Sequence, residues 1–139
     1  MAQGRKRTQE CGEPQAHQRL THAKSFLDVA ELTADVNDPN LEYGSVAASV
    51  AILAGIAATD AVCCHVLGRR SRSDNHHDAE DLLREITGGG KQAAGQLRKL
   101  ITLKDAAHYG FISVSASQLK QSIRQTQHLV DFAENVLLR

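Results

Sequence analysis

Residues 46–67 read VAASVAILAGIAATDAVCCHVL and form a long apolar stretch in which only Asp60 and His65 bring an acidic or basic side chain. The length would suit a membrane span. However, much of the apolar character comes from alanine, and Asp60 would cost about 2.5–3.5 kcal/mol in the bilayer. Asp38-Pro39-Asn40 before the stretch is typical of a turn, and Gly68-Arg69-Arg70 after it is typical of a helix C-terminus. We therefore expect a buried central helix and no membrane partner.

The composition favours an all-α fold. The chain has 139 residues, enough for one hydrophobic core. It contains 19 alanines, no tryptophan and only two prolines, and aromatic residues make up 4%, which argues against sheets that stack RNA bases on aromatic rings. Basic and acidic residues number 16 each, so the formal net charge is zero. This balance excludes a uniformly basic nucleic-acid coat but allows a local basic patch.

Apolar positions three and four residues apart predict helices around the central one. The first is expected over residues 14–35, and the central helix over 41–67. A third helix, capped by Ser73 or Asp74, is expected to break at Gly88-Gly89-Gly90 and to resume over 91–108. A capping box at Ser115 and Gln118 starts the last helix.

These elements predict an up-and-down antiparallel four-helix bundle with a broken third helix, over residues 14–139. Residues 1–13 carry a basic run, Arg5-Lys6-Arg7, that no apolar segment follows. We expect them to form a flexible N-terminal tail rather than a secretory signal.

The three cysteines are Cys11, Cys63 and Cys64. Their number is odd, two of them are adjacent, and their spacing does not match a metal site. We expect reduced, buried thiols and a cytoplasmic location. The sequence gives no sign of a metal or an organic cofactor.

Asp60 requires a partner, because an unpaired carboxylate is costly to bury. His76 and His77 are expected at the start of the next, antiparallel helix, close to the end of the helix that carries Asp60. We expect a polar network in which one of these histidines binds Asp60. The role of Asp60 is either structural or functional, and a functional Asp60 would orient a catalytic histidine or line a cleft.

A second candidate group is Lys104, His108 and Tyr109, near the end of the 91–108 helix. Lys104 and His108 are four residues apart and therefore share a helix face. A neutral histidine can act as a general base, and a lysine can stabilise charge on a phosphate. The alternative is an ordinary polar helix end with a tyrosine packed at its edge.

The segments AGIAATDA (54–61), Leu67-Gly68-Arg69, DNHH (74–77) and LKDAAHYG (103–110) resemble the HEPN superfamily, and in particular small actinobacterial HEPN-domain proteins. The resemblance covers about residues 15–138. It implies a helical bundle that pairs into homodimers. Many HEPN members are metal-independent RNases of toxin–antitoxin or defence systems, with an Arg-x4–6-His motif at the dimer cleft. Other members bind nucleotides, RNA or partner proteins such as minimal nucleotidyltransferases.

The chain departs from this motif upstream of His108, because positions 101–103 hold Ile, Thr and Leu and the nearer Lys104 is not arginine. Lysine lacks the planar fork with which arginine binds phosphate. We therefore expect a non-catalytic, dimeric nucleotide-, RNA- or protein-binding module. The alternative is a metal-independent endoribonuclease that uses His108 with Lys104, supported by Asp60 and Tyr109.

A local basic strip precedes His108. It consists of Lys91, Arg98 and Lys99, and it leads to Lys104 on the same predicted helix. If the chain contacts RNA, we expect this strip to be the nucleic-acid-binding surface.

Overall fold

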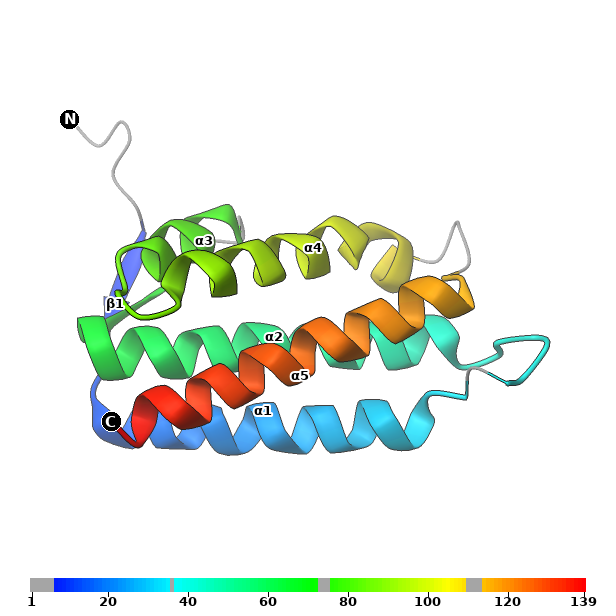
Figure 1. Cartoon of the computed structure of the whole chain (residues 1–139), viewed down its shortest axis with the longest axis horizontal. Coiled ribbons are helices and arrows are strands. Elements are labelled where there is room, and N and C mark those ends of the chain that lie inside the picture. Colours follow the sequence, from blue (N-terminus) through cyan, green and yellow to red (C-terminus); the bar gives the residue numbers. More distant parts are fainter. Residues whose placement is uncertain (1–6, 36, 73–75, 110–113) are drawn as a thin grey trace.

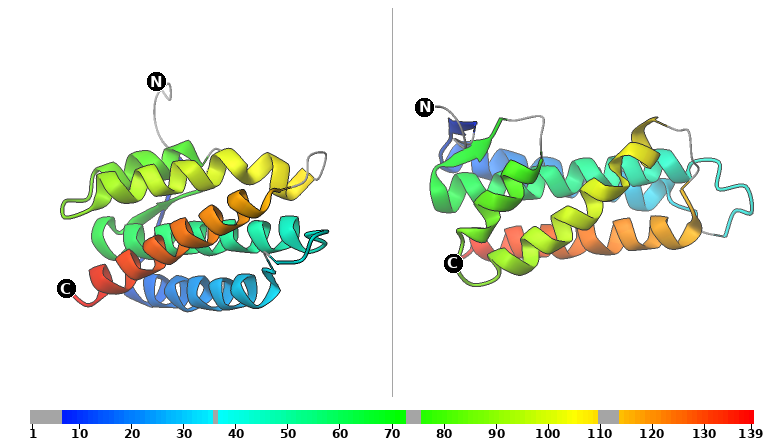
Figure 2. Two further views of the ribbon diagram at one scale, coloured as in Figure 1. Left: turned by 45° about the vertical axis from the view of Figure 1, so that its right-hand side comes forward. Right: turned by 90° about the horizontal axis from the view of Figure 1, so that it is seen from above.

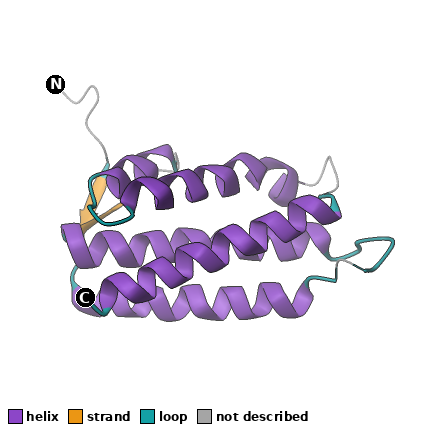
Figure 3. Cartoon of the chain, viewed as in Figure 1, coloured by secondary structure: helices purple, strands orange, loops and turns teal. Residues whose placement is uncertain are grey.

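The computed structural model describes residues 7–35, 37–72, 76–109 and 114–139, without the side chains of Asp105, Ala106, His108 and Tyr109. Over these ranges the chain is mostly helical, which confirms the all-α prediction (Figure 3). The helices are α1 (Glu13–Thr33), α2 (Gly44–Leu67), α3 (His77–Arg84), α4 (Gly90–Tyr109) and α5 (Ala116–Leu137). Two short strands, β1 (Thr8–Glu10) and β2 (Arg69–Ser71), pair antiparallel.

Helix α2 lies in the interior and packs against α1, α4 and α5. By length and composition it could cross a membrane, but 67% of its most apolar window is buried inside the molecule. Figure 1 shows that α1 and α4 run in one direction and that α2 and α5 run in the opposite one. The central, buried position predicted for residues 46–67 is therefore confirmed.

Small residues let α1 approach α2 closely. Ala16, Ala23 and Ala30 are fully buried and recur every seven residues along α1. The helix begins at Gly12, whose backbone N–H donates to Gln15 Oε1 at 2.9 Å, and Pro14 lies in the first turn. These three residues, the alanine seam of α1, thus form the face of the helix that enters the core.

Glycine allows three helices to meet at the middle of α2. A Cβ atom at Gly55 would lie 2.5 Å from Leu100 Cδ1 of α4 and 3.3 Å from Leu129 Cδ1 of α5. Nearby, Thr126 Oγ1 of α5 donates to the backbone carbonyl of Ala51 at 2.9 Å. The close contact of α2 with α4 and α5 therefore depends on the absence of a side chain at residue 55.

The break between α3 and α4 occurs where the glycines predict it. Gly88 and Gly89 have φ angles of 76° and 123°, which glycine adopts without strain. Helix α4 then begins at Gly90. The predicted capping box also forms, since Ser115 Oγ accepts from Gln118 N at 3.1 Å and Gln118 Oε1 accepts from Ser115 N at 2.9 Å.

The N-terminal segment differs from the prediction. Residues 8–10 are not a flexible tail but strand β1, which pairs with β2. The two views in Figure 2 place this pair at the end of the molecule where α2 ends. Three-residue strands have no recognisable alternation, so the sequence pattern could not reveal them. Residues 1–6 and the predicted cap at 73–74 lie outside the described residues.

Candidate functional site

A cavity of about 210 Å³ lies where α1, α2, β2, the start of α3 and α4 come together. Its described lining is of two kinds: charged or polar residues, which are Arg19, Thr59, Asp60, Arg70, Ser71, Arg72 and His76, and the apolar residues Ile56, Ala79 and Leu97. We call it the arginine cavity. Asp60 and His76 were expected from the sequence to lie together, and both line it.

Asp60 is buried, as predicted, with 7% of its surface exposed, and it forms an ion pair with Arg19 of α1. The Arg19 Nε and Nη2 atoms lie 3.1 Å and 3.0 Å from Asp60 Oδ2. Burial raises the pKa of Asp60, and the positive charges of Arg19 and Arg70 partly offset this rise. Arg19 therefore satisfies the carboxylate that the apolar helix buries.

The expected histidine partner of Asp60 is replaced by this arginine among the described hydrogen bonds. His76 lines the same cavity, whereas His77 Nδ1 lies 3.3 Å from Glu80 Oε1 on α3. The sequence pattern indicated neither Arg19 as the partner of Asp60 nor the burial of Glu80. The position of Arg19 three residues after Ala16 was the available signal, because it places the arginine beside the buried alanine seam of α1.

Strand β2 supplies Arg70, and Arg72 follows the strand directly. Arg70 Nη2 donates to Gln9 Oε1 of β1 at 2.9 Å, and Arg70 Nη1 donates to the Ser71 carbonyl at 3.2 Å. The backbone N–H of Arg72 donates to the Arg7 carbonyl at 3.1 Å. Arg69 instead pairs with Glu85, at 2.9 Å. Pairing with β1 therefore holds Arg70 and Arg72 at the cavity.

The charges of the described lining do not cancel. Arg19 is paired with Asp60, while neither Arg70 nor Arg72 forms an ion pair with an acidic side chain of the described residues. Guanidinium groups donate hydrogen bonds in a planar fork that matches phosphate oxygens. The arrangement is suited to holding a phosphate group.

The second predicted group is only partly described. His108 and Tyr109 belong to α4, but their side chains lie outside the described part of the structure. Lys104 is half-buried. It follows Leu97 by two helical turns, so it shares the α4 face that borders the arginine cavity, about 10 Å further along the axis.

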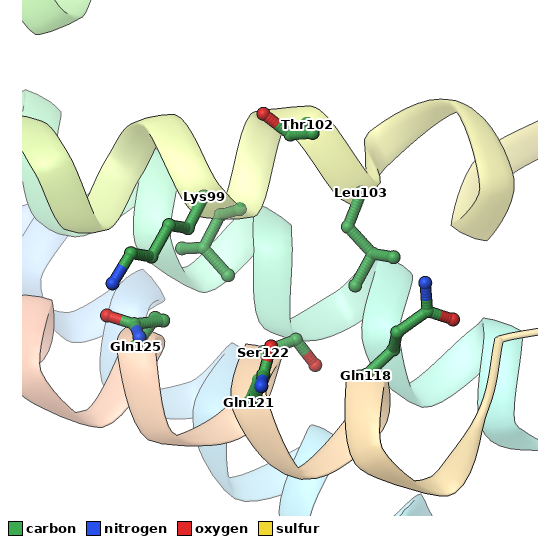
Figure 4. A pocket seen from close by; sticks show the side chains of 8 residues that line it. Lys99, Thr102, Leu103, Gln118, Gln121, Ser122 and Gln125 are labelled. Carbon is green, nitrogen blue, oxygen red and sulfur yellow. The ribbon is translucent and has the colours of Figure 1, made fainter.

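The predicted basic strip is spread over different faces of α4. Lys91 and Arg98 are exposed and seven residues apart, so they share one face. Lys99 lines a separate groove of about 290 Å³ between α4 and α5, where it points toward Gln125 (Figure 4). Neither this groove nor the Lys91–Arg98 face belongs to the arginine cavity.

The prediction of three reduced thiols is wrong for two of the cysteines. Cys11 and Cys64 form a disulfide, although they lie 53 positions apart, and among the described cysteines only Cys63 is free. Pairing requires the N-terminal segment to fold back onto the end of α2, a long-range contact that cysteine spacing cannot indicate. Burial raises the pKa of the Cys63 thiol to about 12.

Among the described residues, no group of three or more histidine, cysteine, aspartate or glutamate side chains is arranged to hold a metal ion. Comparisons of the chain with protein-family models, with curated proteins and with solved structures find no match. The functional argument therefore depends on the geometry of the arginine cavity.

Proposed function

We propose that the chain binds the phosphate of an RNA segment or a nucleotide in the arginine cavity, as a non-catalytic module. The observation that carries this proposal is the pair Arg70 and Arg72, which line a cavity whose described carboxylate, Asp60, is already paired with Arg19. An external phosphate would supply the missing negative charge. The small volume suits one phosphate group with part of its nucleoside.

We further propose that the fold is an up-and-down antiparallel four-helix bundle of the HEPN type. The alternating directions of α1, α2, α4 and α5 and the interruption between α3 and α4 support it (Figure 1). The same resemblance suggests a homodimer of a toxin–antitoxin or defence system, with a minimal nucleotidyltransferase as the partner class. Val46 and Leu53, exposed on α2, offer apolar surface for pairing.

A specific observation favours one alternative function, metal-independent RNA cleavage. Arg70 and His76 are separated by five residues, which fits the Arg-x4–6-His spacing of HEPN RNases, and both line one cavity. His76 would take the proton of a ribose 2′-hydroxyl, and the arginines would stabilise the phosphate as its charge grows. Under this alternative, His76 takes the role that the sequence analysis gave to His108 with Lys104.

Fluorescence anisotropy with a labelled single-stranded RNA of about ten nucleotides tests binding. We expect Arg72→Ala to weaken RNA binding about tenfold. The slope of log affinity against log salt concentration should fall by about one, the equivalent of one phosphate contact. Arg124→Ala, which removes an exposed arginine on α5, is the matched control and should leave affinity unchanged. Loss of binding in Arg98→Ala but not in Arg72→Ala would move the site to α4 and contradict the proposal.

Gel analysis of the same RNA in the presence of EDTA separates binding from cleavage. The proposed function predicts no cleavage above background. Cleavage that His76→Ala abolishes would establish the alternative with His76, whereas cleavage that only His108→Ala abolishes would return the reaction to Lys104 and His108.

A further inference from the structure

The N-terminal strap, residues 7–12, is attached to the end of α2 by one covalent bond and to β2 by a short ladder of hydrogen bonds. Cys11 is bonded to Cys64, and the backbone N–H of Cys11 donates to the Gly68 carbonyl at 3.0 Å. Thr8, Gln9 and Glu10 lie opposite Ser71, Arg70 and Arg69 in the β1–β2 pair. A two-stranded sheet of this length is marginal without further support. The disulfide provides that support at the base of the pair.

The strap in turn positions the cavity. Its Gln9 side chain accepts a hydrogen bond from Arg70, and its Arg7 carbonyl accepts one from the backbone of Arg72. On the other side of the bond, Cys64 follows Asp60 by four residues and therefore lies one turn along α2. The disulfide thus joins the segment that holds two arginines to the helix that holds the carboxylate.

We propose that the Cys11–Cys64 disulfide is a redox switch that controls phosphate binding in the arginine cavity. The inference rests on the proposed function of that cavity. When the bond is formed, the strap holds Arg70 and Arg72 toward the phosphate. When the bond is reduced, the β1–β2 pair loses its anchor, and the two arginines are no longer held in place.

The chemistry is thiol–disulfide exchange with a thiol or dithiol reductant. A reductant thiolate attacks Cys11 Sγ, since Cys11 is half-exposed and Cys64 is buried. The S–S bond breaks, and Cys64 leaves as a thiolate that takes up a proton. The second thiol of a dithiol then attacks the mixed disulfide and releases the Cys11 thiol, so that the protein gains two electrons and two protons while the reductant becomes a disulfide.

The neighbouring thiol, Cys63, does not compete with the reductant for the Cys11–Cys64 disulfide. Cys63 is 1% exposed, and burial raises its pKa to about 12, so it stays protonated and cannot exchange readily with the adjacent bond. This burial favours a reversible Cys11–Cys64 pair, because Cys63 does not divert either cysteine into another disulfide.

The test compares the RNA affinity of the oxidised protein with that of the protein reduced by dithiothreitol. Reduction should weaken binding about tenfold, the equivalent of one lost charge-assisted hydrogen bond. The Cys63→Ser variant should lose RNA affinity on reduction to the same extent as the wild type. The double variant Cys11→Ser/Cys64→Ser should bind like the reduced wild type whether or not dithiothreitol is present.

The outcomes distinguish this inference from the proposed function. Equal affinity in the oxidised and reduced states, with the loss in Arg72→Ala retained, would overturn the switch alone. Absence of binding by the oxidised wild type would overturn the proposed function and the switch with it. Loss of the helical circular dichroism signal on reduction would also overturn the switch, because the bond would then maintain the whole fold.

Discussion

Arg19 and Asp60, 41 residues apart in the chain, form an ion pair in which two guanidinium nitrogens of Arg19 approach one oxygen of the buried Asp60 carboxylate, at 3.0 Å and 3.1 Å. The pair joins α1 to the most buried helix of the molecule. It also forms one wall of the arginine cavity. Stability and the candidate site therefore depend on the same two side chains.

Removal of Arg19 should be costly. Arg19→Ala would leave Asp60 buried without its described partner, and we expect a loss of about 2–4 kcal/mol in the free energy of unfolding. Water screens the pair in part, since Arg19 keeps 30% of its side chain exposed, so the loss should be smaller than for a fully buried pair. Urea denaturation measures this loss. In a double-mutant cycle with Asp60→Asn, the double variant should lose less than the sum of the single losses. Additive losses would show that the pair contributes no coupling energy.

Asp60 should make the free energy of unfolding depend on pH. Its pKa in the folded protein is raised above the ordinary value of 3.8, mainly by burial. Below pH 3.8 the carboxyl is protonated in both the folded and the unfolded state, and its favourable contribution is fully present. That contribution is lost as the pH rises through the folded-state pKa, because the carboxylate then ionises inside the protein.

The measurement is the stability of the wild type minus that of Asp60→Asn, by urea denaturation at a series of pH values. The difference should fall as the pH rises above 3.8 and should become constant above the folded-state pKa. A difference that grows with pH would mean that the charges of Arg19 and Arg70 lower the pKa of Asp60 by more than burial raises it.

The reactivity of Cys63 gives an independent check of the core. With the thiol pKa raised to about 12, only about one molecule in ten thousand carries a thiolate at pH 8. We expect no alkylation of the oxidised, folded protein by iodoacetamide at pH 8, and one modified cysteine after unfolding in guanidinium without reductant. Cys63→Ser should remove that product. Rapid alkylation of the folded wild type would show that Cys63 is not buried.

Gly55 and Gly95 form a matched pair for testing the packing of α2. Gly55→Val would press a side chain against Leu100 and Leu129, and we expect a loss of about 3 kcal/mol, even though valine suits a helix better than glycine. Gly95→Ala has open space around the new methyl group and should stabilise α4 by about 0.5–1 kcal/mol. Thermal unfolding compares both variants with the wild type. A neutral Gly55→Val would contradict the described contact of α2 with α4 and α5.

The helices were largely predictable, because their signals are local. The alanine seam of α1, the apolar run of α2, the glycines before α4 and the Ser115 capping box each depend on residues within a few turns of one another. Strands β1 and β2 were not predictable, because each has three residues and depends on a partner about sixty positions away. The disulfide shares this dependence on distant chain segments.

About half of the candidate site could be predicted from the sequence. Burial of a carboxylate in α2 indicates that Asp60 needs a partner, and the position of His76 indicates the end of α2 where the two meet. Its partner Arg19 depends on the rotation of α1 about its own axis, and the position of Arg70 depends on the β1–β2 pair. Single-sequence patterns determine neither. The Arg70–His76 spacing is present in the sequence, but only the folding of β2 and the start of α3 brings both residues to one cavity.

Phosphate binding in the arginine cavity is tested most directly by nuclear magnetic resonance of the arginine Nε–Hε groups. The oxidised protein is titrated first with inorganic phosphate and then with a short RNA. We predict saturable shifts of the Arg70 and Arg72 signals and no saturable shift of Arg124 on α5. Saturable shifts confined to Arg98, with the Arg70 and Arg72 signals unchanged, would contradict the assignment of the site to the arginine cavity.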